Sequence, residues 1–173
     1  GVLCFDAHAD MRDEYVGEKL MHATFLRRII EDVGPDKVVH VGLRALCREE
    51  LAFIEKNHVR HFSMQELKGH DLEENARNIR RAVSEFEKLY VTIDMDAFDP
   101  GFAPGVGNPE PDGMWPDLFF TILTGLCDER VAGLDLVELS PNCDNGVTAP
   151  LAAKVLFEAI CAVESAKGKN RRK

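Results

Sequence analysis

Two short segments of the chain place acidic residues and a histidine at every second position. The segments are Phe5-Asp6-Ala7-His8-Ala9-Asp10 and Ile93-Asp94-Met95-Asp96, and each ends an apolar run. Along an extended chain, alternate residues point to the same side. Each segment therefore presents one row of ligand atoms. Four carboxylates and one imidazole would converge if the two segments were neighbours in a sheet.

A cluster of four carboxylates needs a countercharge. Two like charges 4 Å apart repel by about 4 kcal/mol at an effective dielectric constant of 20. Two divalent cations would supply the balancing charge, and carboxylates with one imidazole favour ions such as Mn(II) over thiolate-seeking ions. A lone Asp at a strand end is more often a helix N-cap, but capping uses no more than one Asp per strand. The spacing therefore predicts a two-metal centre, with ions about 3.5–4 Å apart.

The elements that must position these rows alternate along the chain. Strands are predicted over 1–5, 37–44, 59–64, 90–93 and 131–139. Helices are predicted over 22–33, 48–57, 71–89, 116–126 and about 149–165, the last with Thr148 as its N-cap. This alternation predicts βαβ units, a parallel sheet and helices on both of its faces. In such sheets the site lies beyond the carboxyl ends of the strands, where both acidic rows begin.

The composition is that of a globular protein with one domain. The 173 residues are 45% hydrophobic, and 21 Lys+Arg against 30 Asp+Glu give a formal net charge of −9. This charge argues against a nucleic-acid partner, and no apolar window is long enough to span a membrane. The five cysteines are far apart, and no secretory leader is recognisable. We therefore expect reduced thiols and a cytoplasmic protein.

The two ends of the chain carry separate expectations. Residues 1–5 form a continuously apolar segment typical of a buried parallel strand, and no initiator Met precedes it. We expect residues 1–166 to be the C-terminal part of a single longer domain, incomplete at its N-terminus; simple trimming of a tag or tail is the alternative. Residues 167–173 are basic, and we expect a disordered tail there.

Together with longer motifs, these residues resemble the ureohydrolase family, which includes arginase and agmatinase. The matching segments are 5–10 (FDAHAD), a segment containing His22, 41–44 (VGLR), 92–113 (TIDMDAFDPGFAPGVGNPEPDG) and 134–144 (LDLVELSPNCD). They cover nearly the whole chain in order. The resemblance implies a three-layer α/β/α sandwich with a parallel sheet, the arginase-like fold, in agreement with the pattern of elements.

The resemblance also implies two Mn(II) ions per active site. The implied ligands are Asp6 and Asp94 bridging both ions, Asp10 on one ion, and His8 and Asp96 on the other. The family carries a further metal-binding His in an upstream Gly-Gly-Asp-His segment, which this chain does not contain. One ion would then keep only three ligands from this polypeptide. A non-catalytic, metal-binding remnant with an assembly or regulatory role is therefore the alternative to an enzyme.

Two further residues receive catalytic and substrate-binding roles from the resemblance. His22 corresponds to a proton-shuttling histidine, and Glu138 to the glutamate that holds the substrate guanidinium through paired charge-assisted hydrogen bonds. In isolation, such a His is more often a surface or capping residue, and such a Glu a salt-bridge partner. The implied reaction is hydrolysis of a guanidino group to urea and an amine. His40, inside a predicted strand, is interpreted as a hydrogen-bonded core residue.

The resemblance is closest to agmatinase. Arginases resemble one another in an Asn-containing loop after the first acidic row and an Asp after the GLR segment; Met11-Arg12-Asp13-Glu14 and Ala45-Leu46 stand there instead. We therefore expect hydrolysis of agmatine to putrescine and urea, with guanidinobutyrate or another guanidino compound as the alternative substrate. Asp13, Glu14 and Glu110 either attract the far amine of the substrate or are ordinary surface charges. Family members are commonly oligomeric, so we expect a homo-oligomer.

Overall fold

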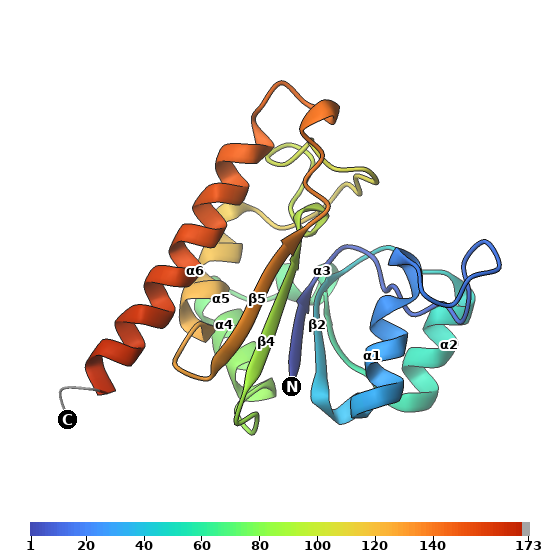
Figure 1. Cartoon of the computed structure of the whole chain (residues 1–173), viewed down its shortest axis with the longest axis horizontal. Coiled ribbons are helices and arrows are strands. Elements are labelled where there is room, and N and C mark those ends of the chain that lie inside the picture. Colours follow the sequence, from blue (N-terminus) through green and yellow to red (C-terminus); the bar gives the residue numbers. More distant parts are fainter. Residues whose placement is uncertain (171–173) are drawn as a thin grey trace.

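The computed structural model describes residues 1–170 and arranges them as five strands surrounded by helices (Figure 1). The strands are β1 (Val2–Phe5), β2 (Val38–Leu43), β3 (Arg60–Ser63), β4 (Leu89–Asp94) and β5 (Val131–Val137). The helices are α1 (Phe25–Val33), α2 (Arg48–Asn57), α3 (Met64–Lys68), α4 (Leu72–Ala82), α5 (Pro116–Leu126) and α6 (Thr148–Asn170). Single 3₁₀ turns span His22–Thr24, Pro35–Lys37, Met95–Ala97 and Pro141–Cys143.

All strand pairs in the sheet are parallel, and the strand order is β3-β2-β1-β4-β5. The chain first builds outward from β1 through β2 to β3 and then returns to add β4 and β5 on the other side of β1. In an open α/β sheet, the crevice at this reversal is where ligands bind. β1 and β4 are in register there, with Phe5 opposite Ile93. The residues that follow each strand, Asp6 and Asp94, therefore begin at the same edge of the sheet.

Helices cover both faces of the sheet, which confirms the predicted three-layer α/β/α architecture. α1 and α2 lie on one side, and α4, α5 and α6 lie on the other (Figure 1). The larger core lies between the sheet and α4–α6, where the rings of Phe5 and Phe119 are 5.0 Å apart. A smaller core packs Leu26 and Ile30 of α1 against Cys4. Full burial of each large apolar side chain contributes about 1.5–3 kcal/mol.

Strand alternation directs the acidic residues toward one face of the sheet. Val91 and Ile93 belong to the core beneath α4–α6, so Thr92 and Asp94 point to the opposite face. Cys4 belongs to the core beneath α1 and α2, and Asp6 continues its row. Asp6 and Asp94 thus extend from neighbouring strands toward the same side.

Several predicted boundaries are wrong. The helix predicted over 71–89 ends at Ala82, and Phe86 occupies the space that a side chain at residue 1 would need. Local periodicity does not reveal this turn, because Val83 and Phe86 are buried as a continued helix would require. The sequence analysis also missed α3, although Ser63 and Glu66 form a capping box at its start.

Smaller differences occur at the other helix ends. The helix predicted over 22–33 is a 3₁₀ turn followed by α1. The hydroxyl group of Thr148, predicted to cap α6, instead accepts the N–H of Gly105 at 2.7 Å. α6 continues to Asn170, so residues 167–170 of the predicted disordered tail are helical, and residues 171–173 lie outside the described residues.

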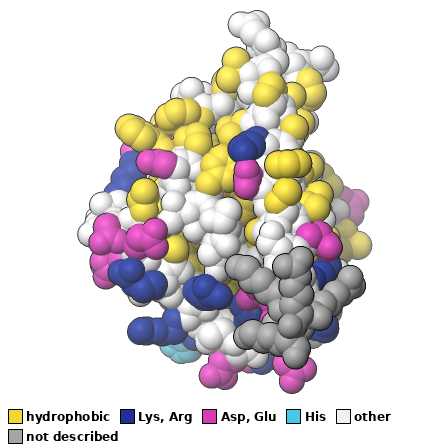
Figure 2. Space-filling model, turned by 90° about the vertical axis from the view of Figure 1, so that its left-hand side faces the viewer, with side chains coloured by type: hydrophobic (Ala, Val, Ile, Leu, Met, Phe, Trp, Pro, Cys, Tyr) yellow, Lys and Arg dark blue, Asp and Glu magenta, His cyan; other side chains and the backbone are white. Residues whose placement is uncertain are grey.

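The surface carries an exposed apolar group on one side of the molecule. Within residues 1–170, no helix is both long and apolar enough to cross a membrane. Hydrophobic side chains do gather on the side where α6 lies (Figure 2). Phe157 and Ile160 of α6 are 61% and 59% exposed, respectively. Exposed apolar side chains in such a group are typical of a surface that contacts another protein.

Candidate metal centre

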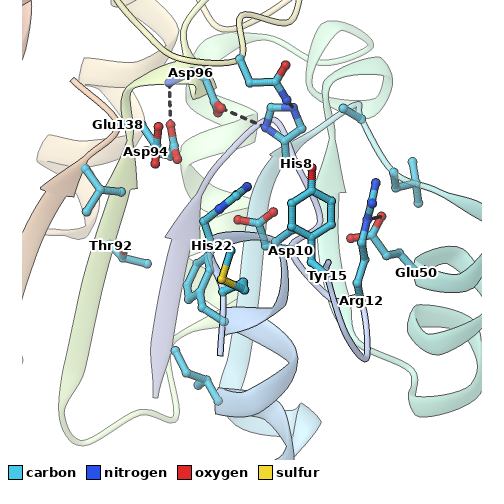
Figure 3. A pocket seen from close by; sticks show the side chains of 18 of the residues that line it. His8, Asp10, Arg12, Tyr15, His22, Glu50, Thr92, Asp94, Asp96 and Glu138 are labelled. Carbon is cyan, nitrogen blue, oxygen red and sulfur yellow. Dashed lines mark hydrogen bonds and ion pairs between the residues drawn. The ribbon is translucent and has the colours of Figure 1, made fainter. Parts of the chain in front are cut away.

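The first acidic row lies directly beyond β1. Asp6 is 1% exposed, and its Oδ1 atom accepts the backbone N–H of His8 at 2.6 Å. The Nδ1 atom of the His8 ring is 2.9 Å from Oδ2 of Asp96 and 3.7 Å from Oδ1 of Asp6. The Nδ1 side of the His8 ring therefore faces a carboxylate of its own row and a carboxylate of the second row. Figure 3 marks the contact with Asp96.

The second row, beyond β4, is tied to the first through the backbone. Asp94 accepts the N–H of Asp96 at 2.8 Å, and Asp96 accepts the N–H of Ala7 at 3.1 Å. These backbone hydrogen bonds fix both carboxylates, in addition to the contact of Asp96 with His8. Gly42 of β2 permits this packing, because a Cβ atom there would lie 3.1 Å from the Asp6 carbonyl oxygen and its φ is +104°. Only glycine adopts that conformation without strain.

The predicted convergence of the two rows is present in the structure. Ligand atoms of Asp6, His8 and Asp96 all lie within 4.8 Å of one another, a spacing that a single metal ion can bridge. Asp10 and Asp94 line the cavity above these residues, and both experience the charge of Asp6. The structure thus assembles all five predicted ligands at one place. Their coordination of metal remains a proposal.

Two of the predicted site residues have an unusual backbone conformation. Asp10 has a φ of 50° and Glu138 a φ of 60°. Residues other than glycine rarely occupy this left-handed region, and doing so stores about 1–3 kcal/mol. Such strain persists where surrounding contacts hold it: the N–H groups of Leu26 and Arg27 both donate to the Asp10 carbonyl. Strain of this kind concentrates at functional sites.

The electrostatics of the cluster call for cations. Burial raises the pKa of Asp6 to about 7, and burial together with the Asp6 charge raises that of Asp10 to about 8. Burial and then the Asp6 charge also raise the pKa of Asp94 far above its usual range. The adjoining Asp6 and Asp96 carboxylates raise the pKa of His8 to about 10. Divalent cations fit this donor set, because they replace the protons that these oxygens otherwise retain.

A second group of possible ligands lies beneath the first. Atoms of Cys4, Asp6 and His40 are also within 4.8 Å of one another, and all three residues are buried. The Nε2 atom of His40 lies 2.7 Å from the His8 carbonyl oxygen, which confirms the interpretation of His40 as a hydrogen-bonded core residue. Burial, and then the nearby Asp6 charge, raise the pKa of the Cys4 thiol well above its usual range. We assign this group to support of His8.

A cavity of about 1630 Å³ opens above the acidic cluster. Most small-molecule pockets measure about 300–1,000 Å³. This one is larger because it continues along the face of β4 and β5, which α1 and α2 do not cover (Figure 1); Tyr90 there is 44% exposed. His22 and Glu138 both line the cavity. Glu138 lies beside Asp94, whereas His22 lies on the opposite wall with its ring edge-on to Tyr15 at 5.2 Å (Figure 3).

The sequence matches the arginase family over residues 1–162. The chain belongs to that family. This membership confirms the resemblance inferred from the motifs. Two curated relatives illustrate the similarity. Guanidinobutyrase from Pseudomonas aeruginosa is 35% identical over 168 residues, which are 94% of this chain and 52% of that protein. Agmatinase from Halalkalibacterium halodurans is 34% identical over 156 residues, 88% of this chain and 51% of that protein.

Solved structures agree with this membership. The agmatine ureohydrolase of Thermoplasma volcanium superposes with a TM-score of 0.88 at 32% identity, covering 97% of this chain and 56% of that one. The arginase-like fold is therefore confirmed. The chain spans about half the length of the curated relatives it matches.

The predicted charges around the substrate divide into two groups. Asp13 is 3.0 Å from Arg28 and 3.4 Å from Arg27, so it forms ion pairs with α1. Glu14 is exposed and is not among the residues that line the cavity. Glu110 does line it, with Oε1 4.0 Å from Nε2 of His8. Of the three acidic candidates, Glu110 is the one placed to meet a substrate.

Three residues support this site in roles that the sequence analysis did not assign. His40 holds the His8 backbone, Arg44 donates to carbonyl groups around Asp96, and the Asn108 amide lies 2.8 Å from the His8 ring. The sequence identified His40 only as a core residue and Arg44 only as part of the VGLR motif. Asn108 lies in the matched segment 92–113, but no local signal indicates its contact with His8, which is 100 positions away.

Proposed function

We propose that this arginase-family chain carries the binuclear metal centre of an amidinohydrolase that hydrolyses agmatine to putrescine and urea. One observation carries the proposal: four carboxylates and an imidazole meet where β1 and β4 end, and burial and mutual repulsion raise the pKa of three of the carboxyls. Asp6 and Asp94 would bridge two Mn(II) ions, Asp10 would complete one site, and His8 and Asp96 would complete the other. When bound, the cations supply Lewis acidity and a water activated at neutral pH.

The remaining residues bind and orient the substrate. The Glu138 carboxylate stands beside Asp94 at the cavity wall, where it can hold a guanidinium through two parallel hydrogen bonds (Figure 3). This contact sets the guanidinium carbon above the metal cluster. His22 faces the cavity from the opposite wall and would deliver a proton to the leaving amine.

A guanidino acid such as guanidinobutyrate is the second candidate substrate, and a specific observation favours it. The Arg12 guanidinium lines the cavity beside Tyr15, 5.2 Å from the centroid of its ring. Arg12 lies beyond Tyr15 as seen from Asp10 (Figure 3), where the far end of an extended substrate would reach. However, Arg12 already has Glu50 at 3.9 Å as a partner. Glu110 lines the cavity with its carboxylate 4.0 Å from His8, and this negative charge favours an amine.

The remaining features of the proposal concern the setting of the enzyme. We expect a cytoplasmic homo-oligomer with no nucleic-acid partner. The exposed Phe157 and Ile160 on α6 support self-association, because a C₂ contact would bury them.

A urea-release assay tests the proposal. The full-length protein should be loaded with Mn(II) and given agmatine, 4-guanidinobutyrate, arginine and guanidine in parallel. We expect urea from agmatine with the highest kcat/KM. Preference for 4-guanidinobutyrate would indicate that Arg12, and not Glu110, binds the end of the substrate far from the guanidino group. Two bound ions without urea from any compound would instead support the metal-binding remnant.

A further inference from the structure

Arg44 makes an unusual set of contacts just beyond β2. Its guanidinium donates to six backbone carbonyl groups: Pro111 (3.0 Å), Gly42 (3.2 Å), Ala97 (3.4 Å), Asp96 (2.7 Å), Phe98 (3.3 Å) and Glu110 (2.7 Å). No ion pair links Arg44 to a carboxylate among residues 1–168. A planar guanidinium with five N–H groups is suited to hold several acceptors in a fixed arrangement. The Arg44 guanidinium therefore holds the backbone of the surrounding segments in place.

The contacts of Arg44 fix both ends of one segment, residues 96–111, which we call the clamped loop. The two shortest bonds, both 2.7 Å, reach the carbonyls of Asp96 and Glu110. The packing there is tight: a Cβ atom at Gly113 would lie 2.6 Å from Nη2 of Arg44 and 2.5 Å from the Asp99 nitrogen. The clamped loop is thus held against Arg44 with no room for a side chain between them.

The clamped loop reaches the metal centre at two points. Asp96 contacts Nδ1 of His8 at 2.9 Å, and Asn108 contacts Nε2 of the same ring at 2.8 Å. A histidine that gives one nitrogen to a metal carries a hydrogen on the other, and a polar partner of that hydrogen fixes the ring. The Asn108 amide fills this role when its oxygen faces Nε2, since oxygen and nitrogen of an amide are assigned from the network.

Asp10, which is proposed to bind the other ion, is held by a different element. The backbone of Asp10 is held by N–H groups of Leu26 and Arg27 from α1, and not by the clamped loop. One metal position therefore depends on the loop through His8 and Asp96, while the other depends on α1 through Asp10. The two shared ligands, Asp6 and Asp94, follow β1 and β4 directly.

We propose that Arg44 is a positioning residue that, through the clamped loop and Asn108, sets the affinity of one of the two metal positions. This inference rests on the proposed function, since it assumes that His8 and Asp96 bind one ion. Loss of Arg44 makes the positions of His8 and Asp96 less fixed and lowers the affinity for the ion that they bind. The affinity of the Asp10 position is unchanged. The reaction then slows through poorer loading of one metal rather than through weaker binding of the guanidinium to Glu138.

The experiment compares the unmodified full-length protein with R44K, N108A and R60K. R44K keeps the charge but loses the planar fork. N108A removes only the partner of the His8 ring and serves if R44K does not fold. R60K is the matched control. Arg60 lies on the distant edge strand β3 and also donates to a backbone carbonyl, that of Ala82, at 2.7 Å.

Mn(II) binding is followed by calorimetric titration, and loop release by the fluorescence of Trp115, the single tryptophan of the chain. We expect two ions on the unmodified protein and on R60K. In R44K and N108A, we expect one unchanged ion and one bound about 10- to 100-fold more weakly. Excess Mn(II) should restore kcat in both variants with an unchanged KM.

Three results would overturn parts of this scheme, and they are distinguishable. Unchanged binding of both ions by R44K and N108A, or equal weakening of both ions, overturns the role of the clamped loop alone. Fewer than two ions on the unmodified protein overturns the proposed metal centre, and the positioning role with it. Recovery of the second ion in N108Q but not in N108A would support the contact of the amide with the His8 ring.

Discussion

Two loops border the cavity above the acidic cluster, and they differ in how far they enter the core. The clamped loop, residues 96–111, places several side chains in the core: Ala97, Phe98 and Ala103 are all 0% exposed. The loop over residues 12–21, which follows the first acidic row, is open to solvent, and Val16 and Leu20 are both 82% exposed. The first loop carries a candidate metal ligand, and the second lies where the far end of a substrate would be.

We expect the two loops to serve different parts of the proposed site, one the metal centre and the other substrate recognition. Arg44 and Asn108 preorganise the clamped loop, which suits a metal centre whose ligands must be held within a fraction of an ångström. The 12–21 loop is held mainly by polar contacts near the surface, among them the Thr24 hydroxyl on the Lys19 carbonyl and the Asp13–Arg28 pair. Loops of this kind tolerate change in sequence, so we expect substrate choice to reside there.

The largest effect should come from Asp94, which both metal positions are proposed to share. Asp94→Asn removes one of the two bridging charges, so we expect loss of both ions and a fall in urea release of more than ~100-fold, since loss of an outer partner alone costs 10–100-fold. Metal content by mass spectrometry and the urea assay measure this. Asp135→Asn is the control, because Asp135 lines the same cavity but is bound by Tyr90 and Thr92. Two ions on Asp94→Asn would contradict the bridging role.

Glu138 tests the recognition side of the comparison without disturbing the metals. Glu138→Gln loses the charge that pairs with a guanidinium, and a hydrogen bond to a charged group contributes about 1.5–3 kcal/mol. We expect guanidine affinity to fall by about 10- to 100-fold with both ions retained, as measured by competition against agmatine turnover. Glu14→Gln, in an exposed residue outside the cavity, should bind as the unmodified protein does. Unchanged affinity in Glu138→Gln would remove Glu138 from substrate binding.

The sequence predicts that the two acidic segments meet, but not the backbone conformation within each segment. The strands end at Phe5 and Asp94, Asp10 has a φ of 50°, and Met95–Ala97 is a 3₁₀ turn, so the extended period of two does not continue through either row. The alternation of strands and helices then predicts a parallel sheet and the edge at which the rows lie. These signals are local, and burial of the flanking strands makes them strong.

The supports of the site have no comparable local signal. Arg44 contacts carbonyls more than 50 positions away, and His40 meets the His8 carbonyl across 32 positions. Those contacts depend on strand order, which periodicity does not specify. The end of α4 fails for a related reason: Phe86 continues the helical pattern of buried residues, yet its ring is needed beside Gly1 at the base of the sheet.

A third prediction concerns pH and the metal-free state. The folded-state pKa values of Asp6 and Asp10, about 7 and 8, exceed the ordinary Asp value of 3.8. A raised folded-state pKa gives stability at low pH that is lost as pH rises through that value. Without metal, Tm should therefore fall between pH 6.5 and 8. Mn(II) replaces the protons, so its apparent affinity should rise by roughly 10- to 100-fold over that interval.

Thermal melts at both pH values, in chelator and in Mn(II), measure this effect. His8 adds to the fall in Tm, because its folded-state pKa of about 10 exceeds the ordinary His value of 6.5, so the folded protein keeps a proton that the unfolded chain loses over this interval. The pKa of His40 is lowered by burial to about 4, and its contribution to stability is constant above pH 6.5. An increment in Tm from Mn(II) that is equal at pH 6.5 and pH 8 would show that these carboxyls carry no protons to displace.

The smallest effect tests whether the shape of the 12–21 loop matters to the substrate. Val16 has a φ of 55°, an outlier for a β-branched residue, and Asn adopts that conformation more readily. Val16→Asn should stabilise the protein by about 0.5–1 kcal/mol, a rise in Tm of about 1–4 °C, with both ions bound as before. Val33→Asn, at an exposed position within α1, should give no such gain.

The KM of Val16→Asn for agmatine then shows whether the strained turn at Val16 affects substrate binding. Tyr15 is next to Val16 and packs against His22, so a relaxed turn can shift the wall that faces the substrate. A stabilised variant with unchanged KM means that the loop is simply under-restrained. A stabilised variant with a raised KM for agmatine, and unchanged Mn(II) affinity, means that the strained turn positions Tyr15 and His22. Either outcome sharpens the division between a fixed metal side and an adjustable substrate side, whereas loss of a metal ion in this variant would contradict that division.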